Sequence, residues 1–120
     1  MKENIIQQKS YVFALRIIKL YGFLVEKQRE FVLSKQILRC GTSVEANIEE
    51  AIGGQSKKDF IFKVSIAYKE ARETHYWIRL LYDSGFLIKK QFGSLIADCE
   101  VLTKITGRIQ KTSKAKDFNS

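Results

Sequence analysis

Apolar residues recur along the chain at alternating steps of four and three, the spacing that places side chains on one face of an α-helix. The first such stripe lies within residues 4–27, and a second one runs over residues 33–51. The third stripe, over residues 60–81, keeps the alternation without interruption, and a fourth begins near Gln91. No segment has the pattern of a β-strand. The pattern therefore predicts four helices.

Polar or glycine-containing segments separate the predicted helices. Residues 28–30 are polar, and the adjacent Gly53 and Gly54 end the second stripe because glycine accepts the left-handed backbone that closes a helix. Ser56 and Asp59 then form a capping box, in which both side chains satisfy free amides in the first turn of the next helix. The connections between the helices are short.

Helices of this length with short connections predict an all-α protein, an antiparallel up-and-down four-helix bundle. With 120 residues and no proline, the chain has room for one core. We expect a single domain over residues 1–112, with the fourth helix ending near Thr112 and a polar basic tail over residues 113–120. The longest apolar run, residues 20–25, is far shorter than the ~20 residues of a bilayer span. No signal peptide is recognisable, so we expect a cytoplasmic protein without membrane contact.

The first and third helices carry more apolar side chains than one core face needs. A helix that is apolar on several sides needs several partners, and most soluble assemblies are closed homo-oligomers. The alternative is that a four-helix core is simply wide. The candidate residues of an oligomer interface are Tyr11, Ile18, Tyr68, Trp77 and Tyr82.

The charge balance favours a polyanionic partner. The chain has 21 Lys+Arg against 13 Asp+Glu, a net charge of +8 and a pI near 9.6. A basic surface suits RNA or DNA, because each neutralised phosphate releases condensed counterions. The alternative is that the charge only keeps a small protein soluble, since no aromatic RNA-binding motif accompanies it. The excess is concentrated near the C-terminus, where the candidate residues are Lys104, Arg108, Lys111, Lys114 and Lys116.

Residues that would carry catalysis or bind a metal are scarce. A di-iron bundle needs Glu-x-x-His on two helices, but the one histidine, His75, has Arg72 three residues before it. Cys40 and Cys99 are not paired at zinc-ligand spacing, and both lie on core stripes where a thiol is buried and inert. We therefore expect no metal, no cofactor and no enzymatic activity.

Four polar residues flank the core stripes of the second and third helices. One interpretation is a solvated flank with pairs inside each helix. The other, which we favour, is a buried network that ties the two helices together and fixes their register. The residues are Asn47, Glu50, Glu70 and Glu73.

Segments in the middle of the chain carry a family resemblance. Residues 43–50 read Ser-Val-Glu-Ala-Asn-Ile-Glu-Glu, and residues 56–60 read Ser-Lys-Lys-Asp-Phe, followed by Ile-Ala at 66–67 and the Glu-containing run 70–73. This order resembles the 23S rRNA intervening-sequence protein family, also known as S23-type four-helix bundle proteins. The family pattern is a Ser, then Asn-Ile-x-Glu-Gly, Gly-Arg, Ser-x-Lys-Asp-Phe, and Ile-Ala followed by Glu. The resemblance covers nearly the whole chain.

The chain departs from the family pattern at two positions. Ala51 stands where the family often has Gly, and Gly54 where it often has Arg. If that Arg contacts nucleic acid in relatives, its contribution is missing, and Lys57 and Lys58 are the candidates to compensate.

The resemblance also implies an assembly and a class of partner. Related bundles are basic homopentamers, and one branch, the accessory proteins of diversity-generating retroelements, binds nucleic acid and a reverse transcriptase. The family supports no catalytic residues. Two hypotheses follow: a non-catalytic, ring-forming module that binds RNA or DNA, and a protein-interaction scaffold, for instance for a nucleic-acid-processing enzyme, that does not bind nucleic acid itself.

Overall fold

The structure is a computed structural model that describes residues 2–119, with side chains described for residues 5–113. Its residues form helices and connecting segments, and no strand occurs between residues 2 and 119, so the all-α class is confirmed. The helices are α1 (Lys2–Glu26), α2 (Leu33–Ile52), α3 (Lys57–Asp83) and α4 (Lys89–Asn119).

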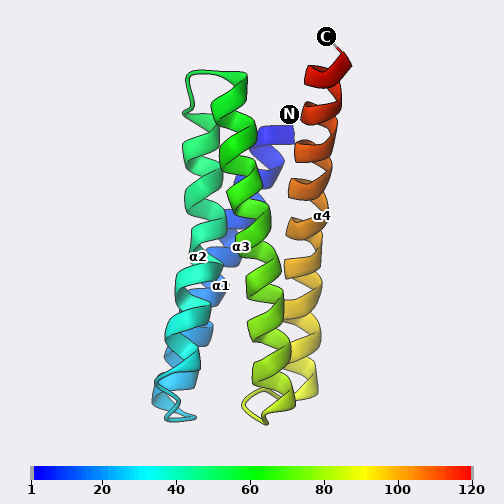
Figure 1. Cartoon of the computed structure of the whole chain (residues 1–120). Helices are drawn as coiled ribbons and strands as arrows, with labels where there is room; N and C mark the ends of the chain where they lie inside the picture. The colour runs from blue at the N-terminus through cyan, green and yellow to red at the C-terminus, as the bar shows by residue number, and fades with distance from the viewer. Residues whose placement is uncertain (1, 120) are drawn as a thin grey trace.

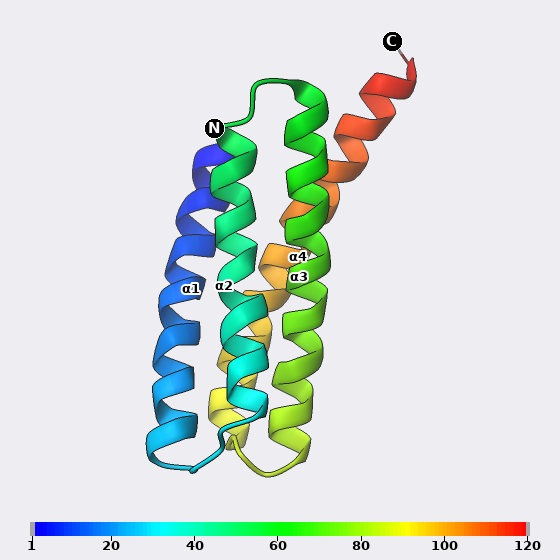
Figure 2. The same ribbon diagram turned by 60° about the vertical axis from the view of Figure 1, so that its left-hand side comes forward.

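The helices lie side by side in an elongated body of 52 × 22 × 21 Å (Figure 1). Each helix packs against the next one along the chain, whereas α1 and α4 share the least extensive interface. In Figure 2 the C-terminal half of α4 leans away from the other helices. The α1–α4 side is therefore the most open side of the molecule.

The predicted stripes form the core. Phe13, Ile17 and Leu24 of α1 are fully or almost fully buried, and Leu81 of α3 and Leu102 of α4 pack into the same cluster. The hydroxyl groups of the buried polar residues donate to backbone carbonyls of their own helix or its N-terminal turn, which satisfies them in the core. These bonds are Ser10 to Gln7 (3.1 Å), Ser34 to Glu30 (2.9 Å), Thr74 to Glu70 (2.7 Å) and Thr106 to Leu102 (2.7 Å).

Two side chains cap the helices that follow the polar breaks. Ser56 Oγ accepts a hydrogen bond from the Asp59 amide at 3.1 Å, which confirms the Ser56 part of the predicted capping box of α3. At the start of α2 the carboxylate of Glu30 accepts from the amides of Ser34 (2.7 Å) and Leu33 (3.0 Å). Burial raises the pKa of Glu30, but these backbone bonds outweigh it and hold that pKa below its usual value. Glu30, in the polar segment before α2, thus also caps that helix.

The end of the last helix differs from the prediction. Helix α4 continues to Asn119, so the predicted end near Thr112 is wrong for the backbone. After Gly107 the sequence contains neither glycine nor proline, and its Lys, Gln, Arg and Ala residues favour helix. A polar composition therefore does not stop this helix, although it leaves no apolar stripe.

The two cysteines are buried free thiols, as predicted. Burial raises the pKa of Cys40 to about 11 and that of Cys99 to about 12. Thr74 Oγ1 donates to Cys40 Sγ at 3.3 Å, and Cys99 Sγ donates to the Ala71 carbonyl at 3.3 Å. Both thiols are protonated at neutral pH and act as small core residues.

Candidate nucleic-acid interface

A row of exposed basic side chains follows the outer face of α4. Lys104, Arg108 and Lys111 are all exposed, whereas Leu102 and Thr106 on the opposite face are buried. Steps of four and three keep the three cations on one face of the helix. We call these three residues the α4 strip. Lys114 and Lys116 follow on the same helix, but their side chains lie outside the described residues.

The other predicted basic residues lie at the start of α3. Lys57 and Lys58 are exposed. Figure 1 shows the start of α3 at the same end of the molecule as the C-terminal half of α4. The structure thus places all of the predicted basic positions in one half of the bundle.

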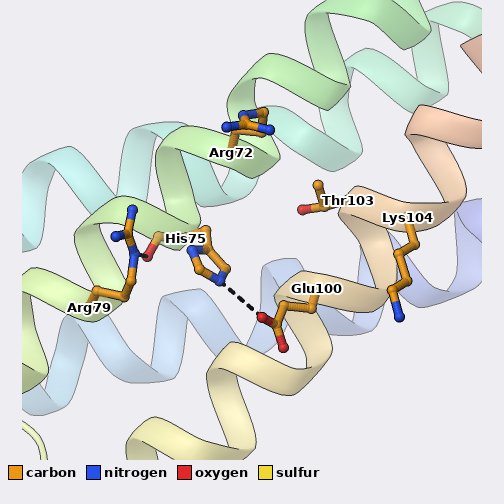
Figure 3. Close-up of a pocket in the computed structure, with 6 residues that line it drawn as sticks. All are labelled: Arg72, His75, Arg79, Glu100, Thr103 and Lys104. Carbon is orange, nitrogen blue, oxygen red and sulfur yellow. Dashed lines mark hydrogen bonds and ion pairs between the residues drawn. The ribbon is translucent and has the colours of Figure 1, made fainter.

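A pocket between α3 and α4 extends this basic region, and it was not predicted from the sequence. It has a volume of about 520 Å³, and Figure 3 shows side chains from both helices around it. The sequence does carry a signal for this pocket. The residues of α3 that line it each directly follow a core position, namely Ala71, Thr74 or Ile78. The lining residues are Arg72, His75, Arg79, Glu100, Thr103 and Lys104.

The pocket lining is mainly cationic. Three basic side chains stand against one carboxylate, so the formal charge is positive even with His75 neutral. His75 Nε2 lies 3.2 Å from Glu100 Oε2, a contact that joins α3 to α4. Arg72 Nη1 donates to the Tyr68 hydroxyl at 3.2 Å, and Arg79 Nε donates to the His75 carbonyl at 3.4 Å. These two bonds leave further guanidinium donors for a ligand.

The predicted polar network takes a different form. Glu70 Oε2 pairs with Arg39 Nη1 at 3.2 Å, and Glu73 pairs with Arg39 Nη2 and accepts from Trp77 Nε1 at 3.0 Å. The side chain of Arg39 is 50% exposed. Glutamates therefore tie α2 to α3 as predicted, but through surface ion pairs rather than a buried network.

A further ion pair joins α2 to α3 at the other end of the two helices. Glu50 Oε1 pairs with Lys63 Nζ at 2.7 Å across α2 and α3. The side-chain amide of Asn47 donates to the Ser43 carbonyl at 2.8 Å, a bond inside α2. The prediction that Asn47 ties the two helices is wrong, because its side chain bonds to the carbonyl one turn earlier, as short polar side chains in helices often do.

The five candidate interface residues separate into two groups. On α1, Tyr11 and Ile18 are 55% and 52% exposed, and no other helix covers them. On α3 the candidates are half-buried by neighbours in the same chain: the Tyr82 ring stacks on Phe92 with centroids 4.3 Å apart. Tyr68 lies against Gly107 of α4, and Trp77 bonds to Glu73. The wide-core alternative therefore accounts for Tyr68, Trp77 and Tyr82 of α3, but not for Tyr11 and Ile18 of α1.

Two features are absent from the part of the chain that the structure describes. No group of three or more His, Cys, Asp or Glu side chains in it could hold a metal ion. None of its helices is both long enough and apolar enough to span a membrane.

Comparisons with known proteins agree with this fold. The family model of the 23S rRNA-intervening sequence protein matches residues 2–108. A crystal structure of a protein with unknown function from the S23 ribosomal protein family of Bacteroides thetaiotaomicron VPI-5482 superposes with a TM-score of 0.90 at 50% sequence identity. The match covers 92% of this chain and 99% of that chain. No curated protein matches. The chain thus belongs to the family of 23S rRNA-intervening sequence proteins.

Proposed function

We propose that this protein is a non-catalytic, cytoplasmic accessory protein that binds RNA or DNA and acts as a homo-oligomer of antiparallel up-and-down bundles. The observation that carries the proposal is the convergence of the α4 strip and the α3–α4 pocket into one continuous basic surface, with Lys104 belonging to both. The resemblance to retroelement accessory proteins adds a nucleic-acid-processing enzyme as a further partner.

The α4 strip has the dimensions of a phosphate track. Lys111 lies seven residue steps after Lys104 on the helix, a rise of about 10 Å. Phosphates of one strand follow each other at ~3.4 Å along a duplex axis, so this length spans about three of them. The three cations of the α4 strip can therefore lie opposite three successive phosphates without any change in the helix.

Acidic side chains close to the basic surface are largely neutralised by other cations. Glu70 and Glu73 pair with Arg39, and Asp98 pairs with Arg16 of α1 at 2.6 Å. The carboxylate inside the pocket is Glu100. Glu100 offsets one of the three cations that line the pocket, so the pocket keeps a net positive charge.

The strip should dominate the affinity for nucleic acid. We expect the triple variant Lys104→Gln, Arg108→Gln, Lys111→Gln to bind a mixed-sequence 30-nucleotide RNA about five- to tenfold more weakly, with all sequences affected alike. Each lost phosphate contact should also flatten the slope of log affinity against log salt by about 0.7 to 0.9. Fluorescence anisotropy over a salt series measures both effects.

A matched control removes three charges at the other end of the bundle. Lys27, Lys35 and Lys89 are exposed there, and their replacement by Gln should leave the affinity and the salt slope close to the parent values. If the strip variant also binds like the parent, the strip is a solubility feature and the protein-interaction scaffold becomes the better hypothesis.

Helix α1 supports the homo-oligomer. Val12 and Leu15 are exposed beside Tyr11 and Ile18. A cavity of about 290 Å³ between α1 and α4 has a mixed lining, in which Val12 and Val101 lie with apolar and polar neighbours. A second copy that covers this side would bury these exposed apolar side chains. A ring, pentameric by family resemblance, would also repeat the basic surface and add avidity without new contacts.

Light scattering at micromolar concentration tests the assembly. We expect a mass several times 13.9 kDa, near five chains. The double variant Tyr11→Glu, Ile18→Glu should lower that mass, because it places carboxylates in an apolar interface. The double variant Lys57→Glu, Lys58→Glu makes a larger charge change at exposed sites away from α1 and should keep the parent mass. A parent mass near 13.9 kDa would contradict the homo-oligomer.

A further inference from the structure

We infer that the α3–α4 pocket binds the terminal phosphate monoester of a nucleic-acid strand. This inference rests on the proposed function and names the part of the nucleic acid that the pocket recognises. The volume of about 520 Å³ lies within the ~300–1,000 Å³ of small-ligand pockets, so it can hold a terminal nucleotide.

The charge of the pocket suits a monoester better than an internal diester. A phosphate monoester carries about −1.5 to −2 at pH 7, whereas an internal phosphodiester carries one negative charge. Arg72, Arg79 and Lys104 together exceed the single carboxylate of Glu100 by two positive charges. The two excess positive charges of the pocket thus match both negative charges of a terminal phosphate monoester.

Two of the three cations lie on the side of the His75–Glu100 contact from which the α4 strip approaches. Figure 3 shows Arg72 and Lys104 on one side of the His75–Glu100 contact and Arg79 on the other, with side chains from both helices bordering the same space. The guanidinium groups of Arg72 and Arg79 are planar forks that bind phosphate oxygens in pairs. Lys104 lies at the point where the pocket meets the α4 strip.

The contact between His75 and Glu100 makes this pocket the end of a track. This 3.2 Å contact joins α3 to α4 across the pocket. A strand that follows the α4 strip from Lys111 toward Lys104 reaches this contact next, and a continuing phosphate chain would then meet the carboxylate of Glu100. Repulsion between like charges favours a strand that ends there over one that continues.

The test compares three 20-nucleotide RNAs of one sequence: with a 5′-phosphate, with a 3′-phosphate and with hydroxyl groups at both ends. We expect one phosphorylated RNA to bind at least fivefold more tightly than the hydroxyl-ended RNA in fluorescence anisotropy with an internal label. The arm that gains affinity identifies which end enters the pocket.

Variants assign the difference to the pocket. Arg72→Gln should abolish the preference for the phosphorylated end, and it should weaken binding of the hydroxyl-ended RNA no more than the control variant Lys69→Gln does, because Arg72 lines the pocket but lies outside the α4 strip. Lys69→Gln removes one exposed charge from α3 away from the pocket, and it should keep the preference. Glu100→Gln should strengthen binding of the phosphorylated RNA several-fold, because it removes the repelling carboxylate.

Failure of this inference and failure of the proposed function give different results. Equal, salt-sensitive binding of all three RNAs overturns the terminal-phosphate pocket and leaves nucleic-acid binding standing. Absence of binding to any of the three RNAs at low salt overturns both. A preference that Arg72→Gln and Lys69→Gln reduce equally overturns the pocket, since it then reflects net charge alone.

Discussion

Gly41→Ala is expected to lower the free energy of unfolding by about 2 kcal/mol, although alanine is a better helix former than glycine by about 1 kcal/mol. A Cβ atom on Gly41 of α2 would lie 2.7 Å from Cγ1 and 2.9 Å from Cγ2 of Ile17 on α1. Ile17 is 0% exposed, and its β-branched side chain is stiff, so it cannot turn away easily. Overpacking of a rigid core costs ~1–3 kcal/mol, and at these distances we expect the upper end of that range. Chemical denaturation at fixed protein concentration measures the change.

Gly22→Ala is the matched control for this substitution. Gly22 lies within α1, and a Cβ atom there would have nothing within 4 Å. The helix propensity then acts alone, so the variant should be more stable than the parent by about 1 kcal/mol. The two glycine variants should therefore change stability in opposite directions.

The contact with Ile17 can be tested in a double-mutant cycle. Ile17→Ala alone should cost about 3 to 4 kcal/mol, because it leaves a cavity among fully buried side chains. In that background Gly41→Ala should be neutral or stabilising, since the new Cβ enters the vacated space. An equal cost of Gly41→Ala in both backgrounds would show that the clash with Ile17 is not its cause.

The close approach at Gly41 illustrates how much of the fold is predictable from the sequence. Steps of four and three predict that the stripe positions of α2 near residue 41 face the core, and the structure buries them. The same spacing does not show which residue of α1 lies opposite, because that depends on the crossing of two helices. Periodicity within a helix predicts burial, whereas pairing between helices requires the packing itself.

The candidate site also combines residues that the sequence predicts with residues that it does not predict. Lys104, Arg108 and Lys111 are predictable as an exposed row, because they share one face of a single helix. Arg72 and Arg79 were not predicted, since their approach to Lys104 depends on which side of α3 faces α4. The predicted burial of Asn47 and the glutamates in one network was wrong for a related reason: the positions flanking a stripe lie where small rotations of a helix decide between burial and solvent.

A pH-dependent stability is expected from Glu45 on α2. Its Oε2 atom is buried with no hydrogen-bond partner. Burial, together with the neighbouring Glu49 carboxylate, raises the pKa of Glu45 from 4.5 to about 7. The folded chain therefore holds this proton up to about pH 7, whereas the unfolded chain releases it near pH 4.5. Because the folded state binds more protons in this window, the contribution of Glu45 to stability falls as the pH rises from about 4.5 to 7.

Glu45→Gln should remove this dependence, since glutamine keeps the shape and carries no charge. At pH 8 we expect the variant to be more stable than the parent by about 1–2 kcal/mol, a value reduced from the full shift because solvent reaches part of the side chain. Near pH 4.5 the two proteins should be equally stable. Glu26→Gln, at an exposed position of α1, should change stability by less than about 0.5 kcal/mol at either pH. Urea denaturation at the two pH values separates the causes: a gain of equal size at both would come from packing or a new hydrogen bond of the amide, and only a gain that appears as the pH rises comes from the buried charge of Glu45.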